Sequence, residues 1–350
     1  MKTYKNLYSK LFDWDNLFFA YRKARKGKRS RTPAASFEFN LESNLVQLCQ
    51  ELETKTYAPG HYHSFYIHEP KRRLISAAPF RDRVVHHALC NVIEPIFERS
   101  FLDDSYANRV GKGTHKAIDR AQQYARHFPY VLQCDLKQFF PSIDHELLRQ
   151  VLSRKIADKD VMWLIDQILN SGCGVLAEAY EMAWFSGDNL LAACRPRGLP
   201  IGNLTSQFWA NCYLNPLDHF IKRELKCPGY VRYVDDLLLF GENKESLWMW
   251  KELLVRKLED LRLTIHPQAH PQPVSEGIPF LGFVIYPGFR RLKRRKVVHF
   301  RRKLKEKVTA YQTGQLAFDR LDASVQGWIN HVRYGDTWGL RRAVLKDVVL

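Results

Sequence analysis

The sequence lacks long hydrophobic runs and any recognisable cysteine pattern. No apolar stretch approaches the roughly 18 residues that a membrane-spanning helix needs. Asp13 and Asp15 interrupt the aromatic N-terminal segment, which therefore lacks the apolar region of a signal peptide. The seven cysteines include no pair at zinc-knuckle spacing, and their odd number argues against a full disulfide framework. These absences predict a cytoplasmic protein with reduced thiols and no membrane partner.

The excess of positive charge is confined to two short stretches. The formal net charge is +17, and residues 22–31 carry seven bases while residues 290–307 carry eleven bases and one acid, so bases and acids balance elsewhere. Such concentration favours a polyanionic partner. Nucleic acid is favoured over a membrane because the first stretch has no apolar face to insert. The predicted contacts are Lys26, Lys28, Arg29, Arg294, Arg295, Lys296, Arg301 and Arg302.

Two adjacent acids lie between apolar runs that favour β-structure. Residues 230–234 and 237–240 are rich in β-formers and enclose Asp235 and Asp236, which predicts a β-hairpin with a carboxylate pair at its tip. Taken alone, such a pair is most simply an acidic turn facing water, since Asp is an ordinary turn residue.

A third acid changes that interpretation. Asp135 ends another apolar run, at residues 130–136. Three carboxylates at the ends of half-buried strands repel one another and lose hydration, so hard cations are needed to neutralise them. Mg²⁺ fits because it prefers oxygen ligands and completes its shell with substrate phosphates. Two such ions, roughly 4 Å apart, can promote an in-line phosphoryl transfer.

These residues fall into a known order. Asp135 with Phe140, then Tyr233–Asp236 and then Phe280–Gly282 resemble the palm motifs of reverse transcriptases. Arg197–Gln207 is similar to the form found in reverse transcriptases of diversity-generating retroelements, where an aliphatic residue and Ser-Gln replace the Gln and Ser-Pro of group II intron enzymes. Glu69–Leu89 resembles the fingers of that subgroup, and the resemblance runs from about Tyr57 to the C-terminus.

The resemblance implies an α+β right-hand polymerase fold, with fingers, an antiparallel-sheet palm that carries the catalytic acids, and a helical thumb. Helical periodicity breaks near residues 30–35, and residues 206–221 and 321–332 predict helices. The expected domains are a helical N-terminal extension over 1–56, fingers over 57–128, a palm over 129–285 with inserted helices and a loop or hairpin at 172–200, and a thumb over 286–350.

The resemblance also implies roles for individual residues. Asp135, Asp235 and Asp236 would be catalytic and would bind two Mg²⁺ ions, for which Mn²⁺ could substitute, with assistance from the Leu136 carbonyl. The expected nucleotide-binding residues are Lys71 and Arg73 on the triphosphate, Phe140 against the ribose 2′-hydroxyl, and Ile201 with Gly202 beside the incoming nucleotide. Ala269 stands near a place where the family often has a lysine that could protonate the departing pyrophosphate. His270 could donate instead, and the general acid is left unassigned.

The implied activity is RNA-directed DNA synthesis that yields error-prone, adenine-mutagenised cDNA for targeted gene diversification in a bacterium or phage. The implied partners are a template RNA, the RNA/DNA duplex, deoxynucleoside triphosphates and a small basic accessory oligomer. Alternatives are a group II intron-like or defence-associated reverse transcriptase and a non-catalytic RNA-binding scaffold. A scaffold would tolerate loss of an acid, but all three are present. About 68 residues follow Gly282, which argues against added maturase and endonuclease domains.

Overall fold

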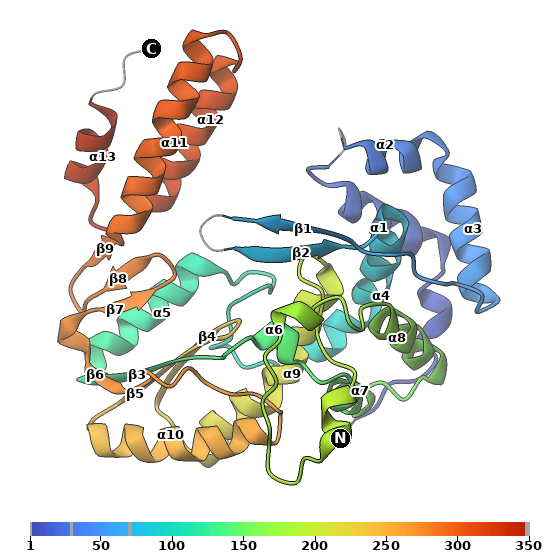
Figure 1. The fold of residues 1–350 in the computed structure, drawn as a ribbon, viewed down its shortest axis with the longest axis horizontal. Helices are drawn as coiled ribbons and strands as arrows, with labels where there is room; N and C mark the ends of the chain where they lie inside the picture. The colour runs from blue at the N-terminus through green and yellow to red at the C-terminus, as the bar shows by residue number, and fades with distance from the viewer. Residues whose placement is uncertain (1, 29–30, 69–71, 347–350) are drawn as a thin grey trace.

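A four-stranded antiparallel sheet forms the centre of the palm, in the order β4-β5-β3-β6. The computed structural model describes residues 2–28, 31–68 and 72–346. The thumb helices rise on one side of the palm and the fingers lie on the other, as expected for a right-hand polymerase fold (Figure 1). The sheet is built from β3 (Tyr130–Asp135), β4 (Gly229–Tyr233), β5 (Asp236–Gly241) and β6 (Pro271–Pro273).

Both faces of this sheet are covered, which explains why its strands are almost continuously apolar. Alternate side chains of a strand point to opposite faces. Leu237 and Leu239 therefore join a core with α9 (Leu204–His219) and α10 (Lys244–Glu259). Leu238 and Phe240 join a second core, with α5 (Thr114–His127) and the strand β7 (Ile278–Phe280).

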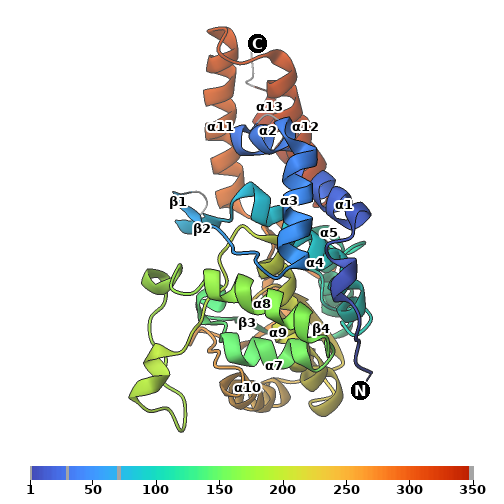
Figure 2. The ribbon, with the colours of Figure 1, turned by 90° about the vertical axis from the view of Figure 1, so that its right-hand side faces the viewer.

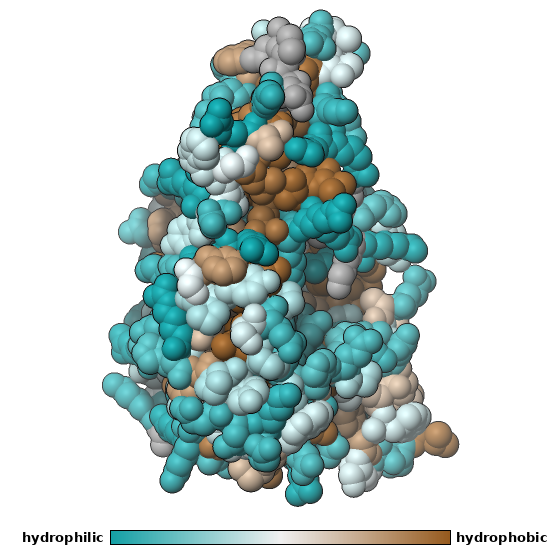
Figure 3. Space-filling model, turned by 90° about the vertical axis from the view of Figure 1, so that its left-hand side faces the viewer, coloured by the Kyte–Doolittle hydropathy of each residue, from teal (hydrophilic) through white to brown (hydrophobic). Residues whose placement is uncertain are grey.

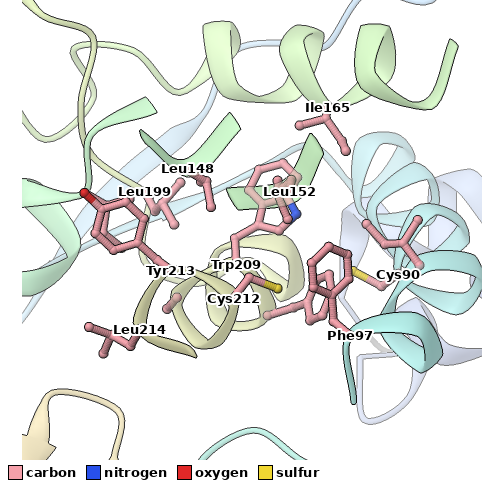
Figure 4. Close-up of a cluster of buried hydrophobic side chains, with 14 of the residues drawn as sticks. Cys90, Phe97, Leu148, Leu152, Ile165, Leu199, Trp209, Cys212, Tyr213 and Leu214 are labelled. Carbon is pink, nitrogen blue, oxygen red and sulfur yellow. The ribbon is translucent and has the colours of Figure 1, made fainter. Parts of the chain in front are cut away.

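Helix α9 is the centre of the larger core and confirms the apolar helix predicted over residues 206–221. A π-helical turn, Phe220–Glu224, continues it. Trp209 and Cys212 of α9 lie among side chains from α4 (Phe80–Glu98), α7 (His145–Ser153) and α8 (Lys159–Ser171) (Figure 4). Asp144 and Asp158 cap the N-termini of α7 and α8 by accepting backbone N–H groups.

The N-terminal extension is helical, as predicted, but its break lies earlier than expected. Its helices are α1 (Trp14–Arg25), α2 (Thr32–Phe39) and α3 (Leu41–Glu53). The sequence pattern predicts the break at residues 30–35, yet α2 already begins at Thr32. Pro33 stands in the first turn of α2, where its missing N–H costs nothing. The fingers contribute an antiparallel hairpin, β1 (His63–Ile67) and β2 (Arg73–Ala77), that extends toward the thumb (Figure 1).

Residues 172–200, all of which the structure describes, form a loop and not a hairpin. Their only regular structure is two 3₁₀ turns, Ala177–Ala179 and Leu190–Cys194. The loop projects from the body of the molecule (Figure 2). Asp188 ties it back to the palm by accepting two hydrogen bonds from Arg262, at 2.6 and 3.1 Å.

A second sheet joins the palm to the thumb. It contains β7, β8 (Phe283–Ile285) and β9 (Arg290–Leu292), and the helices α11 (Arg294–Gln312), α12 (Phe318–Val332) and α13 (Trp338–Leu345) follow. The helix predicted over 321–332 is therefore present as α12. The thumb has a small core of Leu304, Leu321 and Val344, and Figure 3 shows an apolar area at the surface of this part of the molecule.

The thumb is anchored on α5. Asp119 accepts hydrogen bonds from Arg290 at 2.6 Å and from the Tyr334 hydroxyl at 2.9 Å. A Cβ at Gly335 would lie 3.0 Å from Phe283 and 3.1 Å from the Arg290 carbonyl, so a side chain there would force these neighbours to shift. Across the described ranges, no helix combines the length and apolar character needed to cross a membrane.

Candidate active site

The hairpin predicted for the acid pair is present. Strands β4 and β5 pair with Tyr233 opposite Asp236, so Val234 and Asp235 form the two-residue turn. Val234 has φ of +57°, a conformation that a β-branched residue rarely adopts. Strain of this kind persists only where surrounding structure imposes it, and it is concentrated at functional sites. The turn that carries the acids is therefore held in place by its neighbours.

Strand pairing places Asp135 directly opposite Asp236. The Leu136 N–H donates to the Asp235 carbonyl at 3.2 Å, so Leu136 and Asp235 form the hydrogen-bonded pair. Asp135 and Asp236 are then the adjacent non-hydrogen-bonded pair, whose Cα atoms lie about 4.5 Å apart. Directly opposed residues share a face of the sheet. The strands thus bring these two carboxyl groups to one place, beyond the apolar part of that face.

The donor set fits a hard divalent cation. Asp135, Asp235 and Asp236 would supply carboxylate oxygens, and Leu136, which follows Asp135, would supply its carbonyl oxygen. These are the ligands that Mg²⁺ prefers. As the side chains stand, no three His, Cys, Asp or Glu residues in the described part of the chain form a group able to hold a metal ion.

Two of the three acids line a pocket of about 480 Å³ whose wall also includes basic side chains. Asp135 and Asp236 line it together with His266 and Lys293. His266 places Nε2 3.8 Å from an Asp135 carboxyl oxygen, and its backbone N–H donates to the Asp135 carbonyl at 2.9 Å. Sequence reasoning gave His266 no role and included Lys293 only as one of the bases of the stretch 290–307. Both lie far from the acids in the sequence, and only the fold brings them to this pocket.

A second tight turn borders the same pocket. Leu281 and Gly282 both have positive φ, +47° and +94°, as a two-residue hairpin turn of type I′ requires. The turn connects β7 to β8 while Phe280 and Phe283 anchor its ends in the core. The Lys293 N–H donates to the Gly282 carbonyl at 3.0 Å. The motif at 280–282 therefore fixes the backbone of Lys293 beside the acids.

A larger basic pocket, of about 860 Å³, lies between the fingers and the thumb. Arg73, at the start of β2, lines it from the fingers, and Lys293 lines this pocket as well as the acidic one. The thumb side is formed by the start of α11. The predicted nucleic-acid-binding residues found there are Arg294, Arg295, Lys296 and Arg302.

The other predicted basic contacts lie elsewhere. Arg301 is exposed and donates to the Ala343 carbonyl of α13 at 3.1 Å, so it faces away from the basic pocket. Lys26 and Lys28 follow α1 in the N-terminal extension and are exposed. Lys71 and Arg29 lie outside the described residues.

Phe140, Ile201 and Gly202 belong to one connected unit. The Phe140 carbonyl accepts from the Leu199 N–H at 2.9 Å, and the Ile201 carbonyl accepts from the Ser76 N–H of β2 at 2.8 Å. Gly202 has φ of +117°, and a Cβ there would lie 3.0 Å from Ile75. This unit joins palm to fingers, but Phe140 and Ile201 are half-buried and line neither pocket.

Asn203 locks this unit, a role that the sequence did not reveal. Its side chain is buried, accepts from the Ala78 N–H at 3.0 Å, and donates to the Ser76 and Pro200 carbonyls at 2.8 and 3.0 Å. All its hydrogen-bonding partners are backbone groups, so no pattern of side-chain types pointed to it.

Comparison with known proteins identifies the family. Residues 67–285 match the family model described as reverse transcriptase (RNA-dependent DNA polymerase). The chain belongs to the reverse transcriptase family. The group II intron-encoded protein LtrA of Lactococcus lactis subsp. cremoris is 25% identical over 226 residues, which cover 63% of this chain and 36% of LtrA. The protein YkfC of Escherichia coli (strain K12) is 26% identical over 229 residues, which cover 62% of this chain and 52% of YkfC.

The chain thus spans about a third of LtrA and about half of YkfC. Among solved structures, that of apo telomerase from Candida tropicalis truncated from its C-terminal domain aligns with a TM-score of 0.48 at 11% identity, covering 70% of this chain and 59% of that one. The right-hand polymerase fold expected from the sequence is the fold of this reverse transcriptase, and its sequence is homologous to group II intron-encoded reverse transcriptases.

Proposed function

We propose that the protein is an RNA-directed DNA polymerase that extends a primer along a template RNA. The observation that carries the proposal is the direct opposition of Asp135 and Asp236 at the edge of a pocket that adjoins a basic pocket between fingers and thumb. Phosphoryl transfer needs acids to hold cations at the reacting centre and bases to hold phosphates around it. In this protein the acids line one pocket and most of the bases line the other, and the two pockets share Lys293.

Each part of the site has a defined task in this proposal. Asp135, Asp235 and Asp236 hold two Mg²⁺ ions, or Mn²⁺ in their place, with the Leu136 carbonyl assisting. When bound, the ions activate the primer hydroxyl and stabilise the leaving oxygen. Arg73 holds the triphosphate of the incoming deoxynucleotide, with Lys71 beside it in the sequence. The bases at the start of α11 hold the phosphate backbone of the RNA/DNA duplex.

The first test removes the acids. Asp235→Ala and Asp236→Ala should each lower metal-dependent DNA synthesis by about a thousandfold or more, if the lost charge stabilisation is worth about 4 kcal/mol. Binding of template RNA should change little, because the acids hold cations and not the template. Primer extension and filter binding measure the two effects.

Asp103→Asn is the matched control, since the Asp103 side chain is 97% exposed and, among the described residues, its carboxylate pairs with Lys112 at the surface. It should leave both measurements unchanged. Continued primer extension by the purified Asp235→Ala, Asp236→Ala double variant would refute the polymerase proposal and favour a non-catalytic RNA-binding scaffold.

We further propose that the synthesis is error-prone at template adenines, as in diversity-generating retroelements. Ile201 supports this proposal because it occupies a position where group II intron enzymes have a Gln, and it cannot donate or accept a hydrogen bond beside the incoming nucleotide. The backbone around it is fixed by Ser76 and Asn203. A change at Ile201 therefore alters side-chain chemistry with little change of geometry.

Ile201→Gln should lower the error rate at template adenines roughly ten- to a hundredfold, and more than at other bases, because one polar contact can be worth about 1–3 kcal/mol of discrimination. Ile201→Leu, which adds no polar group, is the matched control and should retain the wild-type error spectrum. Sequencing of cDNA made on one RNA template measures both. An unchanged adenine error rate in an active Ile201→Gln variant would remove Ile201 from the mechanism.

A group II intron-like or defence-associated role is the second candidate, and homology to LtrA favours the first of these. The two subtypes differ in the RNA that they take. A diversity-generating enzyme would bind a structured template RNA together with a small basic accessory oligomer, whereas an intron-like enzyme would bind its intron. Sequencing of RNA that co-purifies with the protein, with mass spectrometry of bound proteins, distinguishes them.

A further inference from the structure

A fully buried ion pair lies beneath the turn that carries the acids. The side chains of Arg232, on β4, and Asp218, on α9, are 1% and 0% exposed. Nε and Nη2 of Arg232 each donate to a different Asp218 oxygen at 2.7 Å. This is the bidentate geometry that makes Arg–carboxylate pairs strong and directional. Lysine could not reproduce it.

The third nitrogen of the guanidinium reaches the catalytic turn. Nη1 of Arg232 donates to the Val234 carbonyl at 3.3 Å and to the Asn211 side chain at 3.0 Å. Asn211 in turn donates to the Ala107 carbonyl at 2.9 Å. The head group of Arg232 is thereby held on two sides, and its remaining donor is directed at the residue with the strained backbone.

The backbone of Arg232 is fixed as well. Its N–H donates to the Asp104 carbonyl at 2.8 Å, and its carbonyl accepts from the Tyr106 N–H at 3.0 Å. The Tyr230 hydroxyl donates to Asp218 at 2.7 Å, so this carboxylate accepts three hydrogen bonds. Strand β4 is thus bound on both sides immediately before the turn begins.

Stability alone does not account for such a pair. Desolvation of two buried charges offsets most of their attraction, and apolar replacements of similar volume are often neutral or stabilising. The unusual feature of this pair is its position, three residues from Asp235 and in contact with the strained Val234. We therefore expect the Arg232–Asp218 pair to act mainly on the backbone geometry of the turn at Val234.

We propose that Arg232 is a positioning residue, whose hydrogen bond to the Val234 carbonyl, backed by Asp218 and Asn211, holds the turn so that Asp235 and Asp236 face Asp135. The inference rests on the proposed polymerase function. It concerns how the acids are aligned for cations and not any contact of Arg232 with substrate.

The test compares two variants with the wild-type protein. Arg232→Lys keeps the buried charge but cannot bond both Asp218 oxygens and Val234. The double variant Asp218→Asn, Arg232→Met removes both charges together and keeps an acceptor for the Tyr230 hydroxyl, so it should fold even if Arg232→Lys does not. Arg149→Met, which breaks the exposed pair with Asp166, is the matched control and should match the wild type.

Positioning and stability give different readouts. In the folded variants kcat should fall about tenfold or more, the Mg²⁺ concentration for half-maximal synthesis should rise severalfold, and the Kd for primer–template should stay within about twofold of wild type. A purely structural role would lower the unfolding temperature and the active fraction but would leave the Mg²⁺ requirement of the remaining active enzyme unchanged.

An unchanged Mg²⁺ requirement in the folded double variant would overturn the inference. Failure of the polymerase proposal is distinguishable, because the wild-type protein itself would then synthesise no DNA. Measurement of the unfolding temperature for each variant shows which protein preparations are folded and can be compared.

Discussion

At the scale of single residues, the site depends on side chains whose positions are fixed from distant parts of the chain. Phe140 is an example. It is half-buried, its neighbour Phe139 is buried, and its carbonyl is bonded to Leu199 about sixty residues later. This bond fixes the backbone of Phe140, and its ring lies 5.4 Å from that of Phe139 between centroids. A ring held by both contacts can act as a steric barrier.

Phe140→Ala should therefore raise ribonucleotide incorporation relative to deoxynucleotide incorporation. The increase should be about ten- to a hundredfold, if exclusion of the 2′-hydroxyl is worth about 1.4–2.8 kcal/mol. Phe139→Leu is the neighbouring control and should change the ratio little. Equal rejection of ribonucleotides by Phe140→Ala and wild type in single-nucleotide extension would make Phe140 a core residue only.

The residues that sequence reasoning found and missed differ in a physical way. Asp135, Asp235 and Asp236 border apolar runs rich in β-formers, so the local sequence was enough to predict that they lie at strand ends. Arg232 and Asn203 act through partners that are distant in sequence or belong to the backbone. No local pattern records such interactions, and only the fold reveals them.

At the scale of elements, the basic side chains of α11 face in different directions. Its first turn and Arg302 face the fingers across the basic pocket, whereas Arg301 turns toward α13. The sequence showed the concentration of charge but not this division, because adjacent residues of a helix lie on different faces and packing against α12 and α13 decides which face is presented.

Neutralising Arg294, Arg295, Lys296 and Arg302 to Gln should weaken duplex binding regardless of sequence. The salt dependence of log K should become shallower by up to about 0.9 for each phosphate that the variant no longer neutralises. Neutralising Arg301 and Lys305 on the same helix is the control, with little change of slope expected. Titrations of primer–template binding at several salt concentrations measure both slopes. An unchanged slope in the first variant would mean that these four bases face solvent and do not contact phosphates.

Elements with strong periodicity or turn signals were the predictable ones. The hairpin at Tyr230–Phe240, α9 and α12 follow from apolar spacing. Residues 172–200 carry no such period, and they are held by contacts with distant residues, among them Asp188 with Arg262 and Glu181 with Lys137. The sequence alone therefore does not separate a loop from a hairpin there. The sequence pattern predicts a break at residues 30–35, but Pro33 occupies the first turn of α2, which begins at Thr32.

At the scale of the whole molecule, the buried His86 and the half-buried His87 of α4 couple stability to pH. Burial lowers the pKa of His86 to about 3 and the pKa of His87 to about 4, and nearby positive charges contribute. Histidine in an unfolded chain titrates near pH 6.5. Between about pH 6.5 and 4 the unfolded chain therefore binds protons that the folded protein does not, and acid stabilises the unfolded state.

The free energy of unfolding should consequently be highest above about pH 6.5 and should fall as the pH drops toward 4. Each histidine contributes up to about 1.4 kcal/mol per pH unit. His86→Leu should reduce the slope by about one proton, while His127→Leu, at an exposed position, is the control. Denaturant unfolding at several pH values measures the slope, and equal slopes in wild type and His86→Leu would contradict this origin.

The small core of the thumb governs where the protein opens first. Leu304, Leu321 and Val344 form its buried cluster, whereas the palm and N-terminal extension share one continuous core. Local opening costs least where few apolar side chains are enclosed. Backbone amides of α11–α13 should therefore exchange with deuterium well before those of β3 and β5. The basic pocket beside α11 would then change shape through a local unfolding equilibrium of the thumb, while the palm sheet stays folded.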